Sequence, residues 1–401
     1  MATLFALSWL VGAACSGGAD ASDDDASVDT AVATPVSTST SRPATTTSTA
    51  APPTTTTTIV DDSTILLAWT SGGLPSGFSS AATSQPEVQR STVVLGGQAD
   101  LFASATSDRT PVDQAPEGWA YPQDTIAVTP STYATFTNDP DDRTLIEALL
   151  PGQALLTDSS AAFRGLDVGS TLEMRGGPIT VVGVVSDRAG SEAELVIHHD
   201  DAARLGVDTE RFVLMVRDPA AAPSLDQALT SLAAPTPLYL RTSAVTTRFR
   251  HGDSVVPLIY IKEAFGEFAY RNRSGRDVEI DPAWVDANIV TAQVPILGSV
   301  RCNRAMIEPL TAALGQLEAE GLASAVDPST FSGCWNSRRI LAGQPLSKHS
   351  WGLAVDVNVD GNPRGSFETQ DPRFTQLMRD QGFAWGGDWL VADPAHYELD
   401  P

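Results

Sequence analysis

SKHSWGLAVDVNVD, at residues 347–360, decides the fold of the C-terminal part of this chain. From Leu353 onward apolar and polar residues alternate strictly, which is the pattern of a β-strand with one buried face. Asp356 stands on the polar face of this predicted strand. His349 lies just before a turn that Gly352 permits. The sequence therefore places a histidine-bearing turn directly before a strand that carries a carboxylate.

A second short strand pattern, HYEL at residues 396–399, ends the sequence. If the two strands pair, His349, Asp356 and His396 can converge over one face of a sheet. A catalytic zinc ion takes three protein ligands and keeps a fourth position for water. Two neutral imidazoles and one carboxylate leave positive charge on the metal, which lowers the pKa of the bound water. We therefore expect these three residues to bind Zn²⁺.

Two helices are predicted on either side of the first strand. Residues 303–320 have apolar residues at helical spacing. The apolar face consists of Met306, Leu310, Leu314 and Leu317. The other helix begins with Asp371 as an N-cap before Pro372 and ends at Gly382. Together with the strands, these helices predict an α+β domain from about 250 to 401.

Two motifs in this domain resemble those of a known family. SxHxxGxAxD at residues 347–356, followed by DxxHxE at 393–398, is similar to the VanY/VanX-type D-alanyl-D-alanine carboxypeptidases and the related L-alanyl-D-glutamate endopeptidases. The resemblance extends upstream through Trp284 and Cys334. It implies a Hedgehog/DD-peptidase fold, an α+β sheet that bears one zinc ion.

The resemblance also implies roles for single residues. The family's zinc ligands match the two histidines and the aspartate named above. Its catalytic carboxylate matches Asp393, which would take a proton from the attacking water. Its substrate-binding arginine matches Arg338, although the neighbouring Arg339 leaves that assignment open. Glu398 could orient a ligand histidine, and the tryptophans at 385 and 389 could line the cleft or pack in the core.

These features predict a zinc-dependent metallopeptidase that cuts the stem peptides of peptidoglycan. Whether it is a D-Ala-D-Ala carboxypeptidase or an L-Ala-D-Glu endopeptidase stays open, because that choice depends on the loops of the cleft wall. The alternative is a non-catalytic cell-envelope binding protein with a structural zinc. A serine peptidase with a Ser-x-x-Lys motif is excluded. The two lysines, Lys262 and Lys348, follow Ile259 and Pro345 by three residues.

The N-terminal part predicts export to the cell envelope. Residues 1–15 are apolar, too short to span a bilayer as a helix, and resemble a signal peptide that ends in a bacterial lipobox at Cys15. This cysteine would carry the lipid of a membrane-anchored lipoprotein. Residues 16–62 are rich in Thr, Ser and Pro, which predicts a disordered linker. The remaining cysteines, Cys302 and Cys334, form an even pair that predicts a disulfide in a secreted domain.

Residues 63–245 predict a separate β-rich α+β extracytoplasmic domain. Runs such as ITVVGVV at 179–185 alternate with Gly, Pro and Asp residues. The passage 152–185 resembles the extracytoplasmic core domain of MacB-type transporter permeases, a family that uses this domain for protein contacts. The resemblance implies a protein partner, but it leaves the role of the domain unknown. The residues at 198–200, His-His-Asp, favour a solvated group near a strand end, since no third ligand is near them in sequence.

The charge balance excludes two classes of partner. The chain has 25 basic and 49 acidic residues, a formal net charge of −24. Nucleic acids and anionic membrane surfaces require clustered Lys and Arg. We therefore expect no nucleic-acid partner, and contact with the membrane only through a lipid on Cys15.

Overall fold

The computed structural model describes residues 65–242, 256–341, 345–367 and 369–401. We call residues 65–242 the middle segment and residues 256–401 the C-terminal segment. The predicted signal peptide with Cys15 and the predicted linker at 16–62 lie outside the described residues. No helix in the described ranges is long and apolar enough to cross a membrane.

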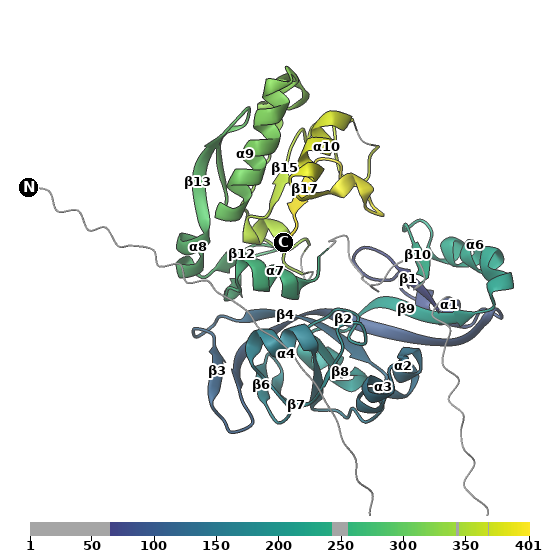
Figure 1. The fold of residues 1–401 in the computed structure, drawn as a ribbon. Coiled ribbons are helices and arrows are strands. Elements are labelled where there is room, and N and C mark those ends of the chain that lie inside the picture. Colours follow the sequence, from purple (N-terminus) through teal and green to yellow (C-terminus); the bar gives the residue numbers. More distant parts are fainter. Residues whose placement is uncertain (1–64, 243–255, 342–344, 368) are drawn as a thin grey trace, which may run out of the picture. The chain divides into compact units, whose positions relative to one another are not determined.

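The middle segment is built on a ten-stranded mixed sheet with strand order β10-β1-β9-β2-β4-β8-β5-β7-β6, in which β3 pairs with β2 (Figure 1). The strands are β1 (Ile65–Trp69), β2 (Val88–Ala105), β3 (Pro111–Gln114), β4 (Tyr121–Val128), β5 (Gln153–Thr157), β6 (Thr171–Met174), β7 (Gly177–Val185), β8 (Leu195–His198), β9 (Thr209–Arg217) and β10 (Tyr239–Thr242). The helices are α1 (Phe78–Thr83), α2 (Pro130–Tyr133), α3 (Pro140–Glu147), α4 (Asp158–Arg164), α5 (Ala202–Leu205) and α6 (Ala222–Ala233).

Strand β1 shows why this sheet contains continuous apolar runs. Ile65, Leu67 and Trp69 belong to the core beneath α2 and α3, whereas Leu66 and Ala68 belong to the core beneath α1 and α6. Both faces of the strand are therefore covered. A strand that is covered on both faces needs apolar side chains at every position, not at alternate ones.

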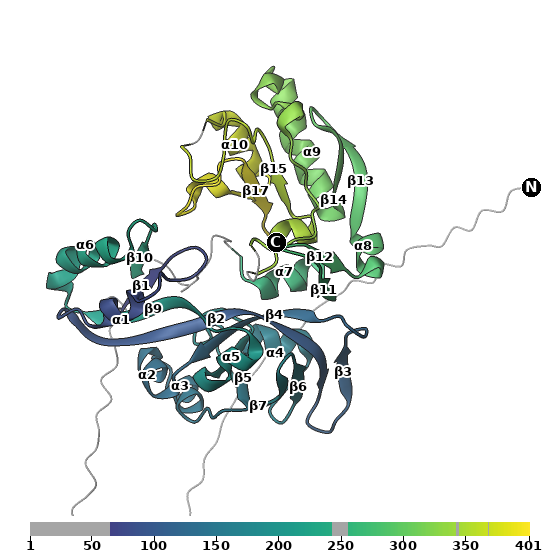
Figure 2. The same cartoon turned by 180° about the vertical axis from the view of Figure 1, so that it is seen from behind.

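The C-terminal segment is a mixed α+β unit with three small antiparallel sheets, β11-β12, β13-β14 and β15-β17-β16 (Figures 1 and 2). Its strands are β11 (Tyr270–Asn272), β12 (Val278–Ile280), β13 (Ile289–Val294), β14 (Gly298–Asn303), β15 (Ala354–Asp356), β16 (Phe383–Trp385) and β17 (His396–Leu399). Its helices are α7 (Leu258–Phe265), α8 (Pro282–Asn288), α9 (Arg304–Ala319) and α10 (Pro372–Asp380), with the 3₁₀ turn η7 (Lys348–Trp351) before β15. Helices α9 and α10 lie side by side in both views and share one hydrophobic core with the strands.

The predicted helices of this segment are confirmed. Asn303 caps α9 by accepting a hydrogen bond from the backbone N–H of Ala305, and Asp371 caps α10 in the same manner. The strand predicted from Leu353 to Asp360 is wrong in length, because β15 ends at Asp356. Asn358 adopts a left-handed backbone with φ 57°, which turns the chain away from the sheet.

Hydrogen bonds and ion pairs connect the two segments. Ala120 and Tyr270 form an isolated antiparallel bridge. Nζ of Lys262, on α7, lies 2.6 Å from a carboxylate oxygen of Glu194 and 2.6 Å from one of Glu267. Arg164 lies 2.6 Å from the same oxygen of Glu267. Neither α7 nor this buried ion cluster was predicted from the sequence, and the division into domains at 63–245 and 250–401 stays a prediction.

Candidate metal centre and its cleft

Three short elements bring the predicted ligands together. In the pairing of β15 with β17, Asp356 lies opposite His396, and η7 supplies His349 just before β15. One ligand atom from each residue lies within 4.8 Å of the other two. Within the described ranges, this is the group of His, Cys, Asp and Glu side chains close enough to hold a metal ion. His198 and His199 meet Asp200 at 3.6 and 3.7 Å but belong to no such group.

Gly352 is needed for the turn that carries His349. Its φ is 68°, in the left-handed region that favours glycine. A Cβ at this position would lie 2.6 Å from the backbone nitrogen of Asn303 and 2.9 Å from Cδ1 of Ile289. The close approach lets the turn before β15 pack directly on the end of β14.

His349 is held in the tautomer that a metal ligand requires. Its Nδ1 lies 2.7 Å from the carbonyl oxygen of Cys334. Because a carbonyl can only accept, Nδ1 carries the proton, and in the neutral ring Nε2 has a lone pair. Nε2 is buried, makes no hydrogen bond of good geometry, and lies 3.1 Å from Oδ2 of Asp356. In the neutral ring, Nε2 of His349 and Oδ2 of Asp356 are thus two hydrogen-bond acceptors that face each other. A bound cation would interact favourably with both atoms.

His396 faces a carboxylate from each ring nitrogen. Its Nδ1 is 2.7 Å from Asp356 Oδ1, and its Nε2 is 3.2 Å from Oε1 of Glu398. Burial lowers the pKa of His396, but the hydrogen bonds to these two carboxylates outweigh it and raise the pKa to about 10. The protonated ring of His396 places a positive charge between the carboxylates of Asp356 and Glu398. A bound divalent cation could supply this positive charge in its place. The ring would then offer Nδ1 to the metal and keep Nε2–H on Glu398.

Asp356 is the carboxylate that both histidines share. Burial alone would raise its pKa, but its close contacts with the imidazole rings of His349 and His396 hold the pKa far below its ordinary value. The donor set is therefore two imidazole nitrogens and one ionised carboxylate. This set fits zinc with an open coordination position.

A disulfide joins Cys302 and Cys334, with a Cα–Cα distance of 5.2 Å, which confirms the predicted pair. Beyond Cys334 the chain reaches Arg338, whose backbone is fixed on the histidine-bearing turn by Ser350. The buried hydroxyl of Ser350 donates to the Arg338 carbonyl at 2.8 Å and accepts from its N–H at 3.0 Å. The turn that carries His349, a candidate metal ligand, therefore also positions the candidate substrate arginine.

The two neighbouring arginines point to different surroundings. Arg338 lines the cavity that contains Asp356 and His396. The guanidinium of Arg339 instead bonds the hydroxyl of Tyr270 at 2.8 Å and the side chain of Asn272 at 3.0 Å. Of the two, only Arg338 lines the cavity that contains the candidate metal ligands.

Asp393 lies in the turn that leads into β17. Its carbonyl accepts the N–H of His396 at 3.0 Å, and its N–H bonds Gly386 at 2.8 Å. Its carboxylate lies 3.3 Å from the guanidinium of Arg364. Sequence reasoning missed Arg364, because a single arginine in a Gly- and Pro-containing loop has no distinguishing pattern.

These residues surround a cavity of about 200 Å³. Its lining includes Arg338, Asp356, Trp389, Asp393, His396 and Glu398. The ring of Trp389 lies 5.1 Å from that of His396. Trp385 stacks on Tyr397 and bonds the Pro394 carbonyl. Of the two tryptophans, only Trp389 is part of the cavity lining.

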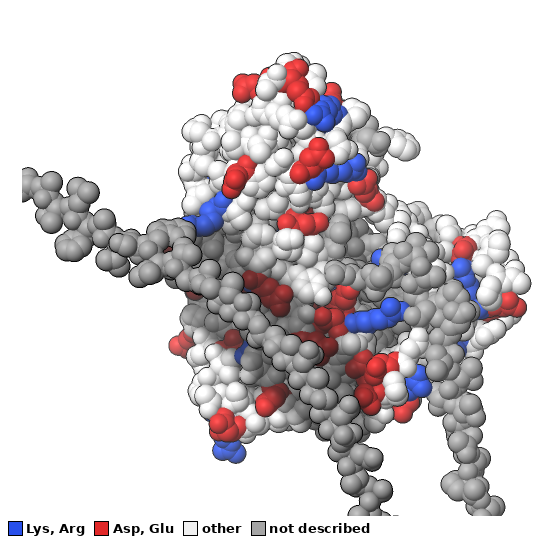
Figure 3. Space-filling view, in the orientation of Figure 1, with Lys and Arg blue, Asp and Glu red and all other residues white. Residues whose placement is uncertain are grey.

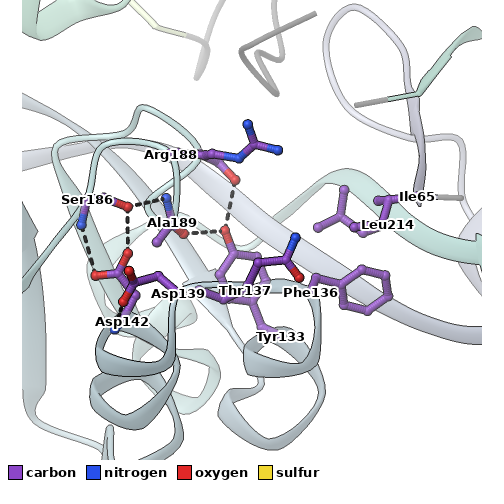
Figure 4. A pocket seen from close by; sticks show the side chains of 12 residues that line it. Ile65, Tyr133, Phe136, Thr137, Asp139, Asp142, Ser186, Arg188, Ala189 and Leu214 are labelled. Atoms are coloured by element: carbon purple, nitrogen blue, oxygen red, sulfur yellow. Dashed lines mark hydrogen bonds between the residues drawn. The ribbon is translucent and has the colours of Figure 1, made fainter. Parts of the chain in front are cut away.

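The middle segment has a smaller cavity of about 110 Å³ (Figure 4). Its polar groups bond one another: Ser186 donates to Asp142 at 2.6 Å, and the Tyr133 hydroxyl donates to the Ala189 carbonyl at 2.8 Å. Burial raises the pKa of Tyr133 to about 12, so the hydroxyl stays a donor. We interpret this network as structural, since its polar groups bond one another and fix the loop that contains Ser186 and Ala189.

The geometry agrees with what the chain resembles. Residues 342–399 match the family model described as D-alanyl-D-alanine carboxypeptidase. The matched stretch contains all three candidate metal ligands and Asp393, and it supports a peptidase. No curated protein matches the chain.

Two solved structures are each similar to part of the chain. One is the periplasmic region of MacB from Actinobacillus actinomycetemcomitans, with 13% identity and a TM-score of 0.31, covering 46% of this chain and 91% of that chain. The other is the extracellular domain of the noncanonic ABC-type transporter YknZ from Gram-positive bacteria, with 10% identity and a TM-score of 0.30, covering 44% and 98%.

Proposed function

We propose that this protein is a zinc-dependent peptidase that hydrolyses the stem peptides of peptidoglycan. The observation that carries the proposal is the buried Nε2 of His349, which makes no hydrogen bond and lies 3.1 Å from the carboxylate of Asp356. The match of residues 342–399 to a carboxypeptidase family supports the same reading. In this proposal residues 250–401 form a Hedgehog/DD-peptidase-like domain.

The roles of the chain's own residues follow from their positions. His349, Asp356 and His396 would hold zinc, which when bound acts as a Lewis acid and lowers the pKa of water. Asp393 would accept a proton from the attacking water and deliver it to the leaving amine. Arg338 would hold a substrate carboxylate or the developing oxyanion.

Two bonds remain candidates for cleavage. The description of the matched family favours the D-Ala-D-Ala bond, and the L-Ala-D-Glu bond is the second candidate. The non-catalytic alternative, a binding protein with a structural zinc, is disfavoured because Asp393 shares a cavity with the ligands. A purely structural metal site is usually closed by a fourth protein ligand.

The remaining parts of the chain fit an envelope protein. We propose that residues 1–15 direct export, that Cys15 carries a lipid anchor, and that residues 16–62 tether the enzyme to the membrane. The domain at 63–245 would contact a protein partner.

Digestion of defined muropeptides tests the proposal. The full chain should release D-Ala from a pentapeptide, or cut between L-Ala and D-Glu, and mass spectrometry of the products identifies the bond. A chelator should abolish the reaction and added Zn²⁺ should restore it, with His349→Ala as the inactive control. Equal product from this variant, or no product from zinc-loaded wild type, would reject the proposed activity.

A further inference from the structure

A second, larger cavity adjoins the catalytic one. Its volume is about 400 Å³, and it shares Arg338, Ile340, Arg364 and Asp393 with the catalytic cavity. Ligand sites usually occupy roughly 300–1,000 Å³. The catalytic cavity alone, at about 200 Å³, is smaller than that range. A substrate that extends beyond the residues next to its scissile bond would therefore also occupy the larger cavity.

Both segments form the walls of this cavity. The C-terminal segment contributes the shared residues and Arg276, from the turn between β11 and β12. The middle segment contributes Arg211, on β9, and the loop that follows β1. The ion pairs of Lys262 with Glu194 and of Glu267 with Arg164 connect the C-terminal segment with the middle segment.

The cavity gathers positive charge in an acidic protein. Among the described residues, its lining contains four arginines, at 211, 276, 338 and 364, and a single carboxylate, that of Asp393. On the face shown in Figure 3, by contrast, basic side chains stand singly among acidic ones. The formal net charge of the whole chain is −24. The cavity is thus a local exception to the charge of the molecule.

Two of the four arginines have no acidic partner among the described residues. Arg211 is paired with Asp124 at 2.6 Å and Arg364 with Asp393 at 3.3 Å, whereas no ion pair of this kind involves Arg276 or Arg338. Burial lowers the pKa of Arg338 and the nearby charge of Arg276 lowers it further, which outweighs the opposing effect of the Asp356 and Asp393 carboxylates. An anion between these two guanidiniums would relieve their repulsion, and the planar fork of arginine suits a carboxylate.

We propose that this cavity is a subsite for a second carboxylate of an acidic peptide substrate, with Arg276 and Arg338 as its ligands and the middle segment as its outer wall. The inference rests on the proposed peptidase function and specifies its substrate. A peptide in which glutamate is linked through its side chain keeps a free α-carboxylate near the scissile bond. Such a group would reach the arginines while the scissile bond lies at the metal centre.

Two synthetic stem peptides test this subsite, one with the free α-carboxylate on its glutamate and one with a carboxamide there. Wild type should prefer the acid through a lower KM. Arg276→Gln should raise the KM for the acid about 10- to 100-fold, as expected for a lost charge-assisted hydrogen bond, and leave the KM for the amide and both kcat values nearly unchanged. Arg211→Gln should also weaken the preference for the acid over the amide.

Arg273→Gln is the matched control, because Arg273 is on the same hairpin but pairs with Glu279 and does not line the cavity. Melting temperatures of all variants show whether they are folded. An equal effect of Arg276→Gln on both peptides, or none, overturns the subsite. An unchanged preference in Arg211→Gln overturns the role of the middle segment.

Calorimetric titration of both peptides separates the subsite from the chemistry. If zinc-loaded wild type cleaves neither peptide but binds the acid more tightly in an Arg276-dependent way, the subsite stands and the peptidase function fails. If it cleaves both peptides without preference, the peptidase function stands and the subsite fails.

Discussion

The carbonyl oxygen of Cys334 lies 2.7 Å from Nδ1 of His349, so a disulfide-bonded cysteine fixes the tautomer of a candidate metal ligand. The bond partner, Cys302, lies at the end of β14 and is fully buried. The disulfide thereby anchors the loop that orients the histidine. Oxidation of the cysteine pair and affinity for the metal should consequently be coupled.

Removal of the disulfide should weaken both the fold and the metal site. The double variant Cys302→Ala, Cys334→Ala should be less stable by about 3–4 kcal/mol, as expected for a cross-link closing a loop of this length. Its metal affinity should also fall, because the Cys334 carbonyl is less firmly placed. Urea denaturation and metal competition measure the two effects. Equal stability of the variant and oxidised wild type would mean that the bond does not support the fold.

Loss of the base should separate turnover from metal binding. Asp393→Asn should keep zinc content and thermal stability near wild type and lose about 10²–10⁴-fold in turnover, because the amide cannot accept the proton. His349→Ala should lose metal and activity together. Zinc content measured beside turnover for both variants checks this. If the Asn variant loses its zinc, Asp393 is a ligand and not the base.

The buried carboxylate of Glu398 should strengthen zinc binding indirectly, through its contact with His396. Its Oε1 lies 3.2 Å from Nε2 of His396, so Glu398→Gln should reduce zinc affinity about 10- to 100-fold. Turnover should recover at saturating zinc. Glu320→Gln is the control, since Glu320 is exposed and pairs with Arg373 at the end of α9. A Glu398 variant that stays inactive at high zinc would point to a direct catalytic role.

The buried lysine on α7 should be essential for stability. Lys262→Met leaves the carboxylates of Glu194 and Glu267 buried without their main partner, which typically costs about 3–5 kcal/mol. The additional change Glu194→Gln should recover part of the loss. Chemical denaturation of the single and double variants measures both steps. A loss below about 1 kcal/mol would show that water reaches the cluster.

A methyl group at Gly386 should disturb the catalytic turn. A Cβ there would lie 2.5 Å from the carbonyl oxygen of Asp393 and 3.3 Å from Cβ of His396. Gly386→Ala should therefore cost about 1–3 kcal/mol and lower turnover. Gly315→Ala, in α9, is the control because its nearest neighbour, Pro295, would be at an ordinary 3.7 Å. Wild-type turnover in the Gly386 variant would show that this turn tolerates displacement.

Local sequence patterns were sufficient to predict much of the secondary structure of the C-terminal segment. The caps of α9 and α10 depend on residues within one turn of each helix start. The alternation that predicted β15 gave the correct face for Asp356, opposite His396 on β17. The length of β15 was wrong because alternation continues through Val357 and Val359 even though Asn358 leaves the sheet. Alternation alone does not report such a turn.

Contacts between residues far apart in sequence could not be predicted. Lys262 and Glu194 are 68 positions apart, and nothing in the sequence around either residue indicates an ion pair. Arg276 and Arg364 have ordinary surroundings in loops and become distinctive only where the chain folds around a cavity. The carbonyl of Cys334 gave no signal either, because a backbone acceptor is present at every residue.

The buried charge of Lys262 also constrains how this protein can change over evolutionary time. If the middle segment were separated from α7, the buried carboxylate of Glu194 would lose its ion pair with Lys262. Lys262 would in turn lose the counterion that Glu194 provides. We therefore expect recombination that separates the two segments to destabilise both of them. Descendants of this chain should inherit the segments as one unit, with substitutions at 194, 262 and 267 occurring together.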